Sequence, residues 1–397
     1  MTTNPQPQDV VIVGAARTPK GRMLGGLARK TAVDLGATAI SAVLERSGVS
    51  ADGVDYVLMG QVVQAAAGQN PAKQSAVAAG LPMTVPAMTI NKVCLSGLDA
   101  VISGARMIKA GDAKVVVAGG QESMTNAPHL AAGVRAGKGY GSLELQDALE
   151  RDGLSDAIQG TAMGLETDEN NAKAGLTREE QDHIAALSQQ RAEAAIADGV
   201  FSDELVAVEV TTRKGTVTVD TDEGVRPGTT EEGLSKLRPA FSKDGTITAA
   251  SASQISDGAA AVVLTTRANV EAEGWEVLAT LGAHGQTAGP DTSLLSQPSQ
   301  ATAAALTKAG WDVNELDFLE INEAFASVVA QSLKDLNYPL DKTNIHGGGI
   351  SLGHPIGCSG ARLVVHAAHE LNRRGSGKAG VSLCGGGGQG DALLLWK

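Results

Sequence analysis

Aromatic residues and cysteines are scarce in this sequence. Phe, Trp and Tyr together make up 3% of the 397 residues, whereas glycine contributes 49. Small and aliphatic side chains must therefore supply most of the packing, and a hydrophobic content of 43% is ample for a core. Three cysteines stand at positions 94, 358 and 384. So few in a long chain indicate free thiols in a reducing compartment rather than a disulfide framework.

Basic charge and long apolar runs are scarce as well. The sequence has 32 Lys and Arg against 44 Asp and Glu, a net charge of -12, with no basic run that would attract a nucleic acid. No apolar run approaches the roughly 20 residues that cross a bilayer. The polar start, residues 1–9, lacks the basic and apolar regions of a signal peptide. We therefore expect a cytoplasmic protein that binds neither nucleic acid nor membrane.

Several segments recur along the chain at nearly one offset. Residues 47–57 align without gaps with residues 309–319, at an offset of 262. Ser96-Gly97 and Ser359-Gly360 begin two expected helices at an offset of 263, and each helix leads through a glycine into an apolar strand. The common spacing, rather than any single match, indicates a duplication. Short strands alternating with helices predict two similar α/β halves.

A segment of different character separates the parts of the first half. It contains acidic stretches, an expected strand at 215–220 and a helix at 177–198, whose start has a capping box of Thr177 and Glu180. We predict an N-terminal half at 1–120 plus 253–275, an inserted loop domain at 121–252, and a C-terminal half at 276–397. An excursion of this kind on a rigid scaffold usually covers or shapes a site.

Cys94 stands just before a predicted helix. Apolar residues at 98, 101, 102, 105 and 108 give the helical period, so the cysteine should lie near the helix N-terminus. The helix dipole would lower the pKa of such a thiol below about 8.5, which makes a nucleophile. The alternative is a small buried side chain with no chemical role.

His354 lies in a loop with six glycines nearby and is followed by a proline. Such a loop suits close approach of backbone or ligand. Its counterpart in the first repeat is Asn91, three residues before Cys94, so packing of the two halves would bring His354 and Cys94 together. An imidazole beside a thiol activates it as a nucleophile. A loop histidine held by backbone hydrogen bonds remains the alternative.

Cys384 ends an expected strand and precedes four consecutive glycines. Their exposed N–H groups suit the binding of an oxyanion, although a flexible hairpin turn would explain the same composition. Asn322 lies between a strand and a helix, either as a helix cap or as a site amide that holds a water. His366 and His369 lie three apart on a helix without a third ligand, so we expect no metal there. No nucleotide-binding or P-loop pattern appears.

Four of these segments together resemble the motifs of the thiolase family (acyl-CoA acetyltransferases), and the resemblance extends over essentially the whole chain. The matching stretches are Asn91-Lys-Val-Cys-Leu-Ser-Gly97, Asn322-Glu-Ala-Phe325, Gly347-Gly-Gly-Ile-Ser-Leu-Gly-His-Pro355 and Cys384-Gly-Gly-Gly-Gly-Gln-Gly390. The resemblance implies a five-layer αβαβα fold of two similar halves with an inserted loop domain that binds coenzyme A.

The resemblance also implies a reaction and a role for each site residue. The reaction is thiolysis of a 3-oxoacyl-CoA or, in reverse, Claisen condensation of two acyl-CoAs. Cys94 would be the nucleophile that carries the acyl group, His354 its base, and Cys384 the acid or base at C2. Asn322, through a water, and His354 would hold the enolate oxygen. The N–H groups of Cys94 and Gly386 would hold the tetrahedral oxygen. No metal or redox cofactor is implied.

Substrate contacts follow from the same resemblance. Arg226, Phe241 and Ser253 would contact coenzyme A, and Met163 and Leu295 would lie near the acyl chain. Where many biosynthetic thiolases have His-Met-Gly, this chain has Ala162-Met-Gly, and Gly233 stands where some relatives have a serine. We expect short, unbranched acyl groups. The family also implies a homodimer or homotetramer.

Two other readings fit part of the pattern. A decarboxylating β-ketoacyl synthase shares the fold and the cysteine nucleophile, but such enzymes have a second His or an Asn where this chain has Cys384. A non-catalytic protein that keeps the thiolase fold would need none of the four residues at positions 94, 322, 354 and 384.

Overall fold

The computed structural model describes residues 4–397, so the first three residues of the polar start lie outside the described residues. Both halves contribute strands to one mixed sheet. Within residues 4–397 this sheet has ten strands in the order β14-β15-β16-β13-β1-β12-β5-β3-β4, with β2 paired to β12. The halves join where β1 pairs with β13 in antiparallel register. The strands are β1 (Val10–Arg17), β2 (Gly21–Arg22), β3 (Tyr56–Gly60), β4 (Ala87–Ile90), β5 (Val116–Ser123), β12 (Ser256–Thr266), β13 (Ala279–Ala288), β14 (Phe318–Ile321), β15 (Lys378–Gly385) and β16 (Gln389–Trp396).

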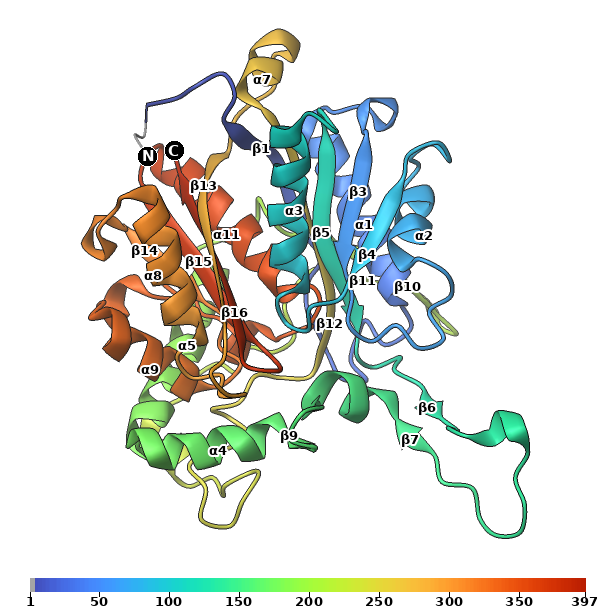
Figure 1. Ribbon diagram of the computed structural model, residues 1–397, viewed down its shortest axis with the longest axis vertical. Helices are drawn as coiled ribbons and strands as arrows, with labels where there is room; N and C mark the ends of the chain where they lie inside the picture. Colours follow the sequence, from blue (N-terminus) through green and yellow to red (C-terminus); the bar gives the residue numbers. More distant parts are fainter. Residues whose placement is uncertain (1–3) are drawn as a thin grey trace.

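Helices lie on both outer faces and between the two parts of the sheet (Figure 1). In the N-terminal half α1 and α2 cover the outer face, and in the C-terminal half α8 and α9 do so. The central layer consists of α3 and α11, which contact each other and strands of both halves. This is the predicted five-layer order. The helices are α1 (Ala32–Ser47), α2 (Pro71–Ala78), α3 (Ser96–Ala110), α7 (Arg267–Glu273), α8 (Gln297–Ala309), α9 (Ala326–Leu336), α10 (Gly349–Leu352) and α11 (Ser359–Arg374).

The starts of α3 and α11 meet through their glycines. A Cβ on Gly360 would lie 2.4 Å from the backbone N of Leu98, and one on Gly97 would lie 2.8 Å from the backbone N of Ala361. Real Cβ atoms do not approach this closely, so both positions require glycine. The two glycines are equivalent in the repeat, and their contact brings the segments that precede both helices to one place.

Local sequence signals account for the helix boundaries. Thr31 and Asp34 form a capping box at the start of α1, and Gly48 ends that helix in the left-handed conformation. In α3 the five apolar positions that gave the helical period are all buried.

The two halves also have equivalent hydrogen bonds at matching positions of the repeat. Asp55 accepts from the backbone N of Lys114, and Asp317 accepts from that of Lys378.

The chain between β5 and β12 leaves the sheet and returns. Its long helix α5 (Arg178–Ala197) has the predicted capping box of Thr177 and Glu180. The hairpin of β10 and β11 packs on the core of the N-terminal half, where Val208 and Val210 are buried with Val11 and Val13. Residues near β6 and β7 form an arm that extends away from the body (Figure 1). The elements are β6 (His129–Leu130), β7 (Gln146–Asp147), β8 (Ser155–Asp156), β9 (Thr161–Ala162), α4 (Met163–Ala174), α5, β10 (Val208–Thr212), β11 (Gly215–Val219) and α6 (Glu231–Ser235).

The boundaries of the predicted domains stay a prediction. In the structure β5 continues to Ser123 and β12 begins at Ser256, so the excursion runs between these two strands. Across residues 4–397, no helix combines the length and the apolar content needed to cross a membrane.

Candidate active site

Cys94 lies in a tight turn that leads into α3. Val93, directly before it, has φ of 51°, a left-handed conformation that is strained for a β-branched residue. The side chain of Asn91 accepts from the backbone N of Val93, and Ser96 accepts from that of Lys92 and donates to the Val93 carbonyl. These side-chain hydrogen bonds hold the strained turn. Strain of this kind persists where neighbouring contacts over-determine the backbone, often at functional sites.

The pKa of the Cys94 thiol differs from the sequence expectation. The cysteine is buried, and desolvation raises its pKa to about 12. The backbone N–H groups of Gly386 and of Cys94 itself lower the pKa in part. α3 begins two residues later, at Ser96, and burial outweighs the effect of these donors. The free enzyme therefore holds a neutral thiol, with two N–H donors directed at its sulfur.

His354 lies in the loop between α10 and α11 and is 6% exposed. Its Nδ1 is 2.5 Å from the Ser359 hydroxyl oxygen, and that hydroxyl donates to the Pro355 carbonyl. Because the hydroxyl proton is used on Pro355, Ser359 accepts from His354, which places the ring proton on Nδ1 and leaves Nε2 as the basic atom. Burial, with Arg362 and Lys20 nearby, lowers the pKa of His354 to about 3. The imidazole is neutral at pH 7, as a base must be.

Asn322 follows the end of β14, and its amide nitrogen lies 3.4 Å from His354 Nε2. It does not cap α9, whose cap position is occupied by Phe325. The amide oxygen of Asn322 is buried and has no hydrogen-bond partner among the described residues. A buried acceptor without a partner favours a bound water or ligand group at this position.

Cys384 lies near the end of β15 and is 1% exposed. Burial raises the pKa of its thiol, and the nearby Cys94 raises it further. Next to it, Gly386 lies close to Met163, whose sulfur would be 3.2 Å from a Cβ at that glycine. The glycine-rich segment is the hairpin turn between β15 and β16, and Gly386 in it also supplies a backbone donor to Cys94.

The predicted catalytic side chains meet in one pocket of about 60 Å³. Cys94, His354 and Cys384 all line it, so residues from both halves and from distant parts of the sequence share one small space. Ser253 and Met163, expected near substrate, line it too. The remaining wall is mostly apolar: Met124, Gly153, Leu154, Gln254, Ile255, Leu294, Ala324, Phe325 and Ile356.

Arg226 and Phe241, two further expected substrate contacts, lie outside the wall of the first pocket. Arg226 lines a neighbouring pocket of about 190 Å³ that also includes Gly233 and shares Gln254 with the first pocket. The ring of Phe241 packs edge-on against Phe325, with ring centres 6.0 Å apart.

Leu295 directly follows Leu294, which lines the first pocket. Both leucines are buried in the core of the C-terminal half. The expected place of Leu295 near the acyl chain stays a prediction.

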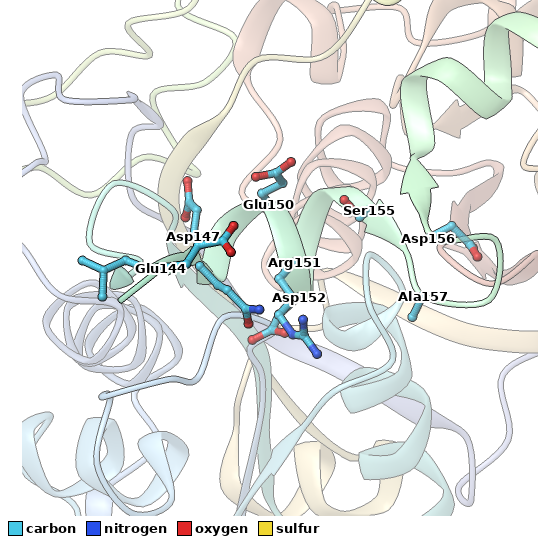
Figure 2. Close-up of a pocket in the computed structure, with 11 residues that line it drawn as sticks. Glu144, Asp147, Glu150, Arg151, Asp152, Ser155, Asp156 and Ala157 are labelled. Carbon is cyan, nitrogen blue, oxygen red and sulfur yellow. The ribbon is translucent and has the colours of Figure 1, made fainter. Parts of the chain in front are cut away.

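A wider pocket of about 550 Å³ lies at the base of the arm (Figure 2). Its wall carries five carboxylates, from Glu144, Asp147, Glu150, Asp152 and Asp156, against the single cation of Arg151. This charge balance repels phosphate groups. The size of the pocket therefore does not make it a nucleotide site, and the chemistry belongs to the smaller pocket.

Sequence reasoning missed two residues that organise the site. Ser359 was noted as the start of a helix, and only the fold shows that its hydroxyl holds His354. Glu122 is fully buried and accepts from the backbone N atoms of Val62, Val63 and Gly357. It thereby joins the N-terminal half to the loop after His354. No local pattern in the sequence marks either role.

The described part of the chain contains no cluster of side chains that could bind a metal ion. No group of three or more His, Cys, Asp or Glu side chains within residues 4–397 is arranged to hold an ion. His366 contacts Glu204, and Nε2 of His369 donates to the Ala15 carbonyl, so the two histidines have different partners.

Comparisons with known proteins give matches to thiolases over nearly the whole chain. The family models of the thiolase N-terminal domain and the thiolase C-terminal domain match residues 10–268 and 275–397. A probable acetyl-CoA acetyltransferase of Mycolicibacterium smegmatis is 54% identical over 97% of this chain and 100% of its own. The acetyl-CoA acetyltransferase of Pseudomonas aeruginosa is 50% identical over 98% of this chain and 99% of its own.

Solved structures show the same likeness. Human mitochondrial 3-ketoacyl-CoA thiolase has a TM-score of 0.94 at 40% identity, covering 98% of this chain and 99% of that one. The acetyl-CoA acetyltransferase of Bacillus anthracis has a TM-score of 0.95 at 38% identity, covering 98% of each. The fold and the site define a condensing or thiolytic acyltransferase of two related halves. The chain belongs to the thiolase family.

Proposed function

We propose that this protein is an acyl-CoA acetyltransferase that cleaves 3-oxoacyl-CoA with coenzyme A, and forms it in reverse, through an acyl group carried on Cys94. The observation that supports this most directly is the shared pocket of Cys94, His354 and Cys384, with the Gly386 N–H donating to the Cys94 sulfur. A fold kept only for binding would need neither two thiols at one small pocket nor a backbone donor aimed at one of them.

The proposed first half of the reaction moves two protons, forms a bond from the Cys94 sulfur to C3 and breaks the C2–C3 bond. Nε2 of His354 takes the thiol proton as the Cys94 sulfur attacks the C3 carbonyl of the substrate. Because the thiol and the imidazole are both neutral beforehand, proton transfer accompanies the attack. The C2–C3 bond then breaks, its electron pair stays with the acetyl-CoA fragment as an enolate, and Cys384 donates a proton to C2. In the second half, the coenzyme A thiol gives its proton to the Cys384 thiolate and its sulfur attacks the acyl carbon. The bond from that carbon to the Cys94 sulfur breaks, and the sulfur takes back the proton held by His354.

Two groups of donors suit the oxygens that become charged. The N–H groups of Cys94 and Gly386 are directed at the Cys94 sulfur. They would bind the tetrahedral oxygen, which forms on the carbon that this sulfur attacks. Asn322 and His354 would hold the enolate oxygen, with a water on the unpartnered amide oxygen. Preorganised donors of this kind are typically worth a few kcal/mol each.

The proposed binding of coenzyme A and of the acyl group is supported by the two neighbouring pockets. Arg226 in the second pocket, Ser253 in the first, and Phe241 would contact coenzyme A. Phe241 packs on Phe325 of the first pocket's wall, and Met163, in that wall as well, would lie near the acyl chain. The first pocket, at about 60 Å³ and with apolar walls, favours short, unbranched acyl groups. The proposed chemistry is covalent and acid–base, and it requires no metal or redox cofactor.

Loss of acetoacetyl-CoA absorbance on addition of coenzyme A tests the function. We expect rapid loss, and we expect turnover to fall as the acyl chain lengthens or branches. Absence of loss with every 3-oxoacyl-CoA tried would favour the non-catalytic reading. Carbon dioxide release from a malonyl thioester, without thiolysis, would favour the β-ketoacyl synthase.

We also propose a cytoplasmic homodimer or homotetramer. All three cysteines are buried and free, in agreement with a reducing compartment. The arm exposes Tyr140, Leu143 and Leu145 to solvent, an arrangement typical of a surface that another copy covers. Sedimentation of the purified chain should give two or four copies. A monomer would contradict this part of the proposal.

A further inference from the structure

An ion pair links the two sulfur-bearing segments. The ammonium of Lys92 lies 2.8 Å from both carboxylate oxygens of Asp391. Lys92 stands two residues before Cys94 in the strained turn. Asp391 lies on β16 and pairs with Leu383 on the neighbouring strand β15, next to Cys384. The ion pair therefore spans from the segment of one thiol to the hairpin of the other.

The surroundings of this pair make it more than a surface contact. Asp391 has a fully buried side chain, and that of Lys92 is 23% exposed. Gln286 donates to Asp391 and also to Asp99 in the first turn of α3, while Asp99 lies 3.7 Å from Lys92. The network thus fixes the turn, the helix that follows it and β16 together. Loss of one partner would leave a buried group unpaired, which is costly.

The strained backbone at Val93 indicates what the ion pair of Lys92 and Asp391 does: it helps to hold the turn in place. A β-branched residue at φ of 51° relaxes unless its neighbours hold it, and Cys94 is the next residue. The hydrogen bonds of Asn91 and Ser96 hold the turn from within, whereas Asp391, in the other half of the molecule, holds it through Lys92. Displacements of about 1 Å in an active site can cost on the order of a hundredfold in rate.

We propose that Lys92 and Asp391 are positioning residues that set the separation of the Cys94 and Cys384 sulfurs. The inference rests on the proposed thiolase function, in which Cys94 takes up an acyl group with His354 as its base, whereas making or breaking the carbon–carbon bond also needs Cys384 nearby. Loss of the pair should therefore impair the step at C2 more than acyl transfer to Cys94.

The full-length variants Lys92→Met, Asp391→Asn and the double variant test this, with Lys92→Arg as the conservative replacement. Lys378→Met is a matched control. Lys378 is 22% exposed, forms an ion pair with Glu315, and stands at the opposite end of β15 from Cys384. Two rates are measured: acetyl transfer from acetyl-CoA to Cys94, by mass spectrometry, and thiolysis of acetoacetyl-CoA.

We expect both single variants to acylate Cys94 within about twofold of the unaltered enzyme, while thiolysis falls about ten- to a hundredfold. The double variant should be no slower than the slower single one, because the two residues act as a unit. Lys92→Arg should recover most of the rate, and Lys378→Met should match the unaltered enzyme. Equal losses in both steps, or additive losses in the double variant, would overturn the proposal.

A measurement that needs no turnover separates this proposal from the proposed function. Oxidation by diamide should form a Cys94–Cys384 disulfide, which peptide mass mapping quantifies and which requires close sulfurs. We expect it to form several-fold more slowly in Lys92→Met and Asp391→Asn than in Lys378→Met. An unchanged disulfide rate would overturn the positioning role even if thiolysis is present. An unaltered enzyme without thiolysis would instead contradict the proposed function.

Discussion

The Ser359 hydroxyl lies 2.5 Å from Nδ1 of His354 and donates its own proton to the Pro355 carbonyl. One serine at the start of α11 therefore fixes both the orientation of the imidazole and the nitrogen that carries the proton. The unprotonated Nε2, which lies 3.4 Å from the Asn322 amide nitrogen, is the atom that the proposed mechanism uses as a base.

Replacement of Ser359 tests this relationship. Ser359→Ala leaves Nδ1 without an acceptor, so the ring can rotate and take the other tautomer. We expect kcat for thiolysis to fall about ten- to a hundredfold, a part of what general base catalysis contributes, with KM nearly unchanged. Ser359→Thr keeps the hydroxyl and should keep most of the rate. Wild-type kcat in Ser359→Ala would show that the serine is only a helix-start residue.

Replacement of Cys94 and replacement of Cys384 should impair different steps of the reaction. Cys94→Ala removes the nucleophile, so mass spectrometry should detect no acyl-enzyme after incubation with acetyl-CoA. Cys384→Ala keeps the nucleophile and should still accumulate the acyl group on Cys94, but it should not condense two acetyl-CoA molecules. Cys358→Ala is the matched control, because Cys358 is equally buried but does not line the pocket. Condensation at the normal rate by Cys384→Ala would refute its assigned role.

Glu122 should give the fold a pH dependence. Burial raises the pKa of its carboxyl to about 7, above the usual value of 4.5, although three backbone N–H groups oppose the shift. Between these two pH values the folded protein holds a proton that the unfolded chain has lost. Stability contributed by this group is therefore present below pH 4.5 and is lost as pH rises toward 7.

Urea unfolding of the unaltered protein and of Glu122→Gln at several pH values isolates this effect. Over the window from pH 4.5 to 7 the free energy of unfolding of the unaltered protein should fall relative to the variant, by up to a few kcal/mol. Glu273→Gln, at an exposed position, should show no such difference. Parallel curves for Glu122→Gln would mean that the buried carboxyl does not hold its proton.

The sequence predicted the elements that depend on local pattern. The helix starts at Ser96 and Ser359 and the capping box at Thr177 follow from residue types and spacing that act over a few residues. Motifs resembling a known family located Cys94, His354 and Cys384, which the fold brings to one pocket. Local patterns of this kind survive folding because they do not depend on distant partners.

Features that depend on the assembled interior escaped prediction. The helix-start position of Cys94 suggested a lowered pKa, yet its burial, which only the packed halves produce, raises it. The hydrogen bond between His354 and Ser359 depends on the packed loop before α11, and no spacing in the sequence marks it. The pairing of Lys92 with Asp391 joins positions nearly 300 residues apart, and neither residue is unusual where it stands in the sequence.

The contact of the two central helices gives the last prediction. Gly360→Ala would put a Cβ 2.4 Å from the Leu98 backbone, where no flexible side chain can yield. Because α3 and α11 would have to separate, we expect a loss of about 2 to 4 kcal/mol in the free energy of unfolding, at or above the upper end for overpacked cores. Gly139→Ala is the control, since nothing lies within 4 Å of a Cβ there. Separation of these helices also moves the turns that carry Cys94 and His354. The kcat of the molecules that fold should therefore fall as well. Near-native stability and activity in Gly360→Ala would show that the central layer tolerates more space than the glycine contact implies.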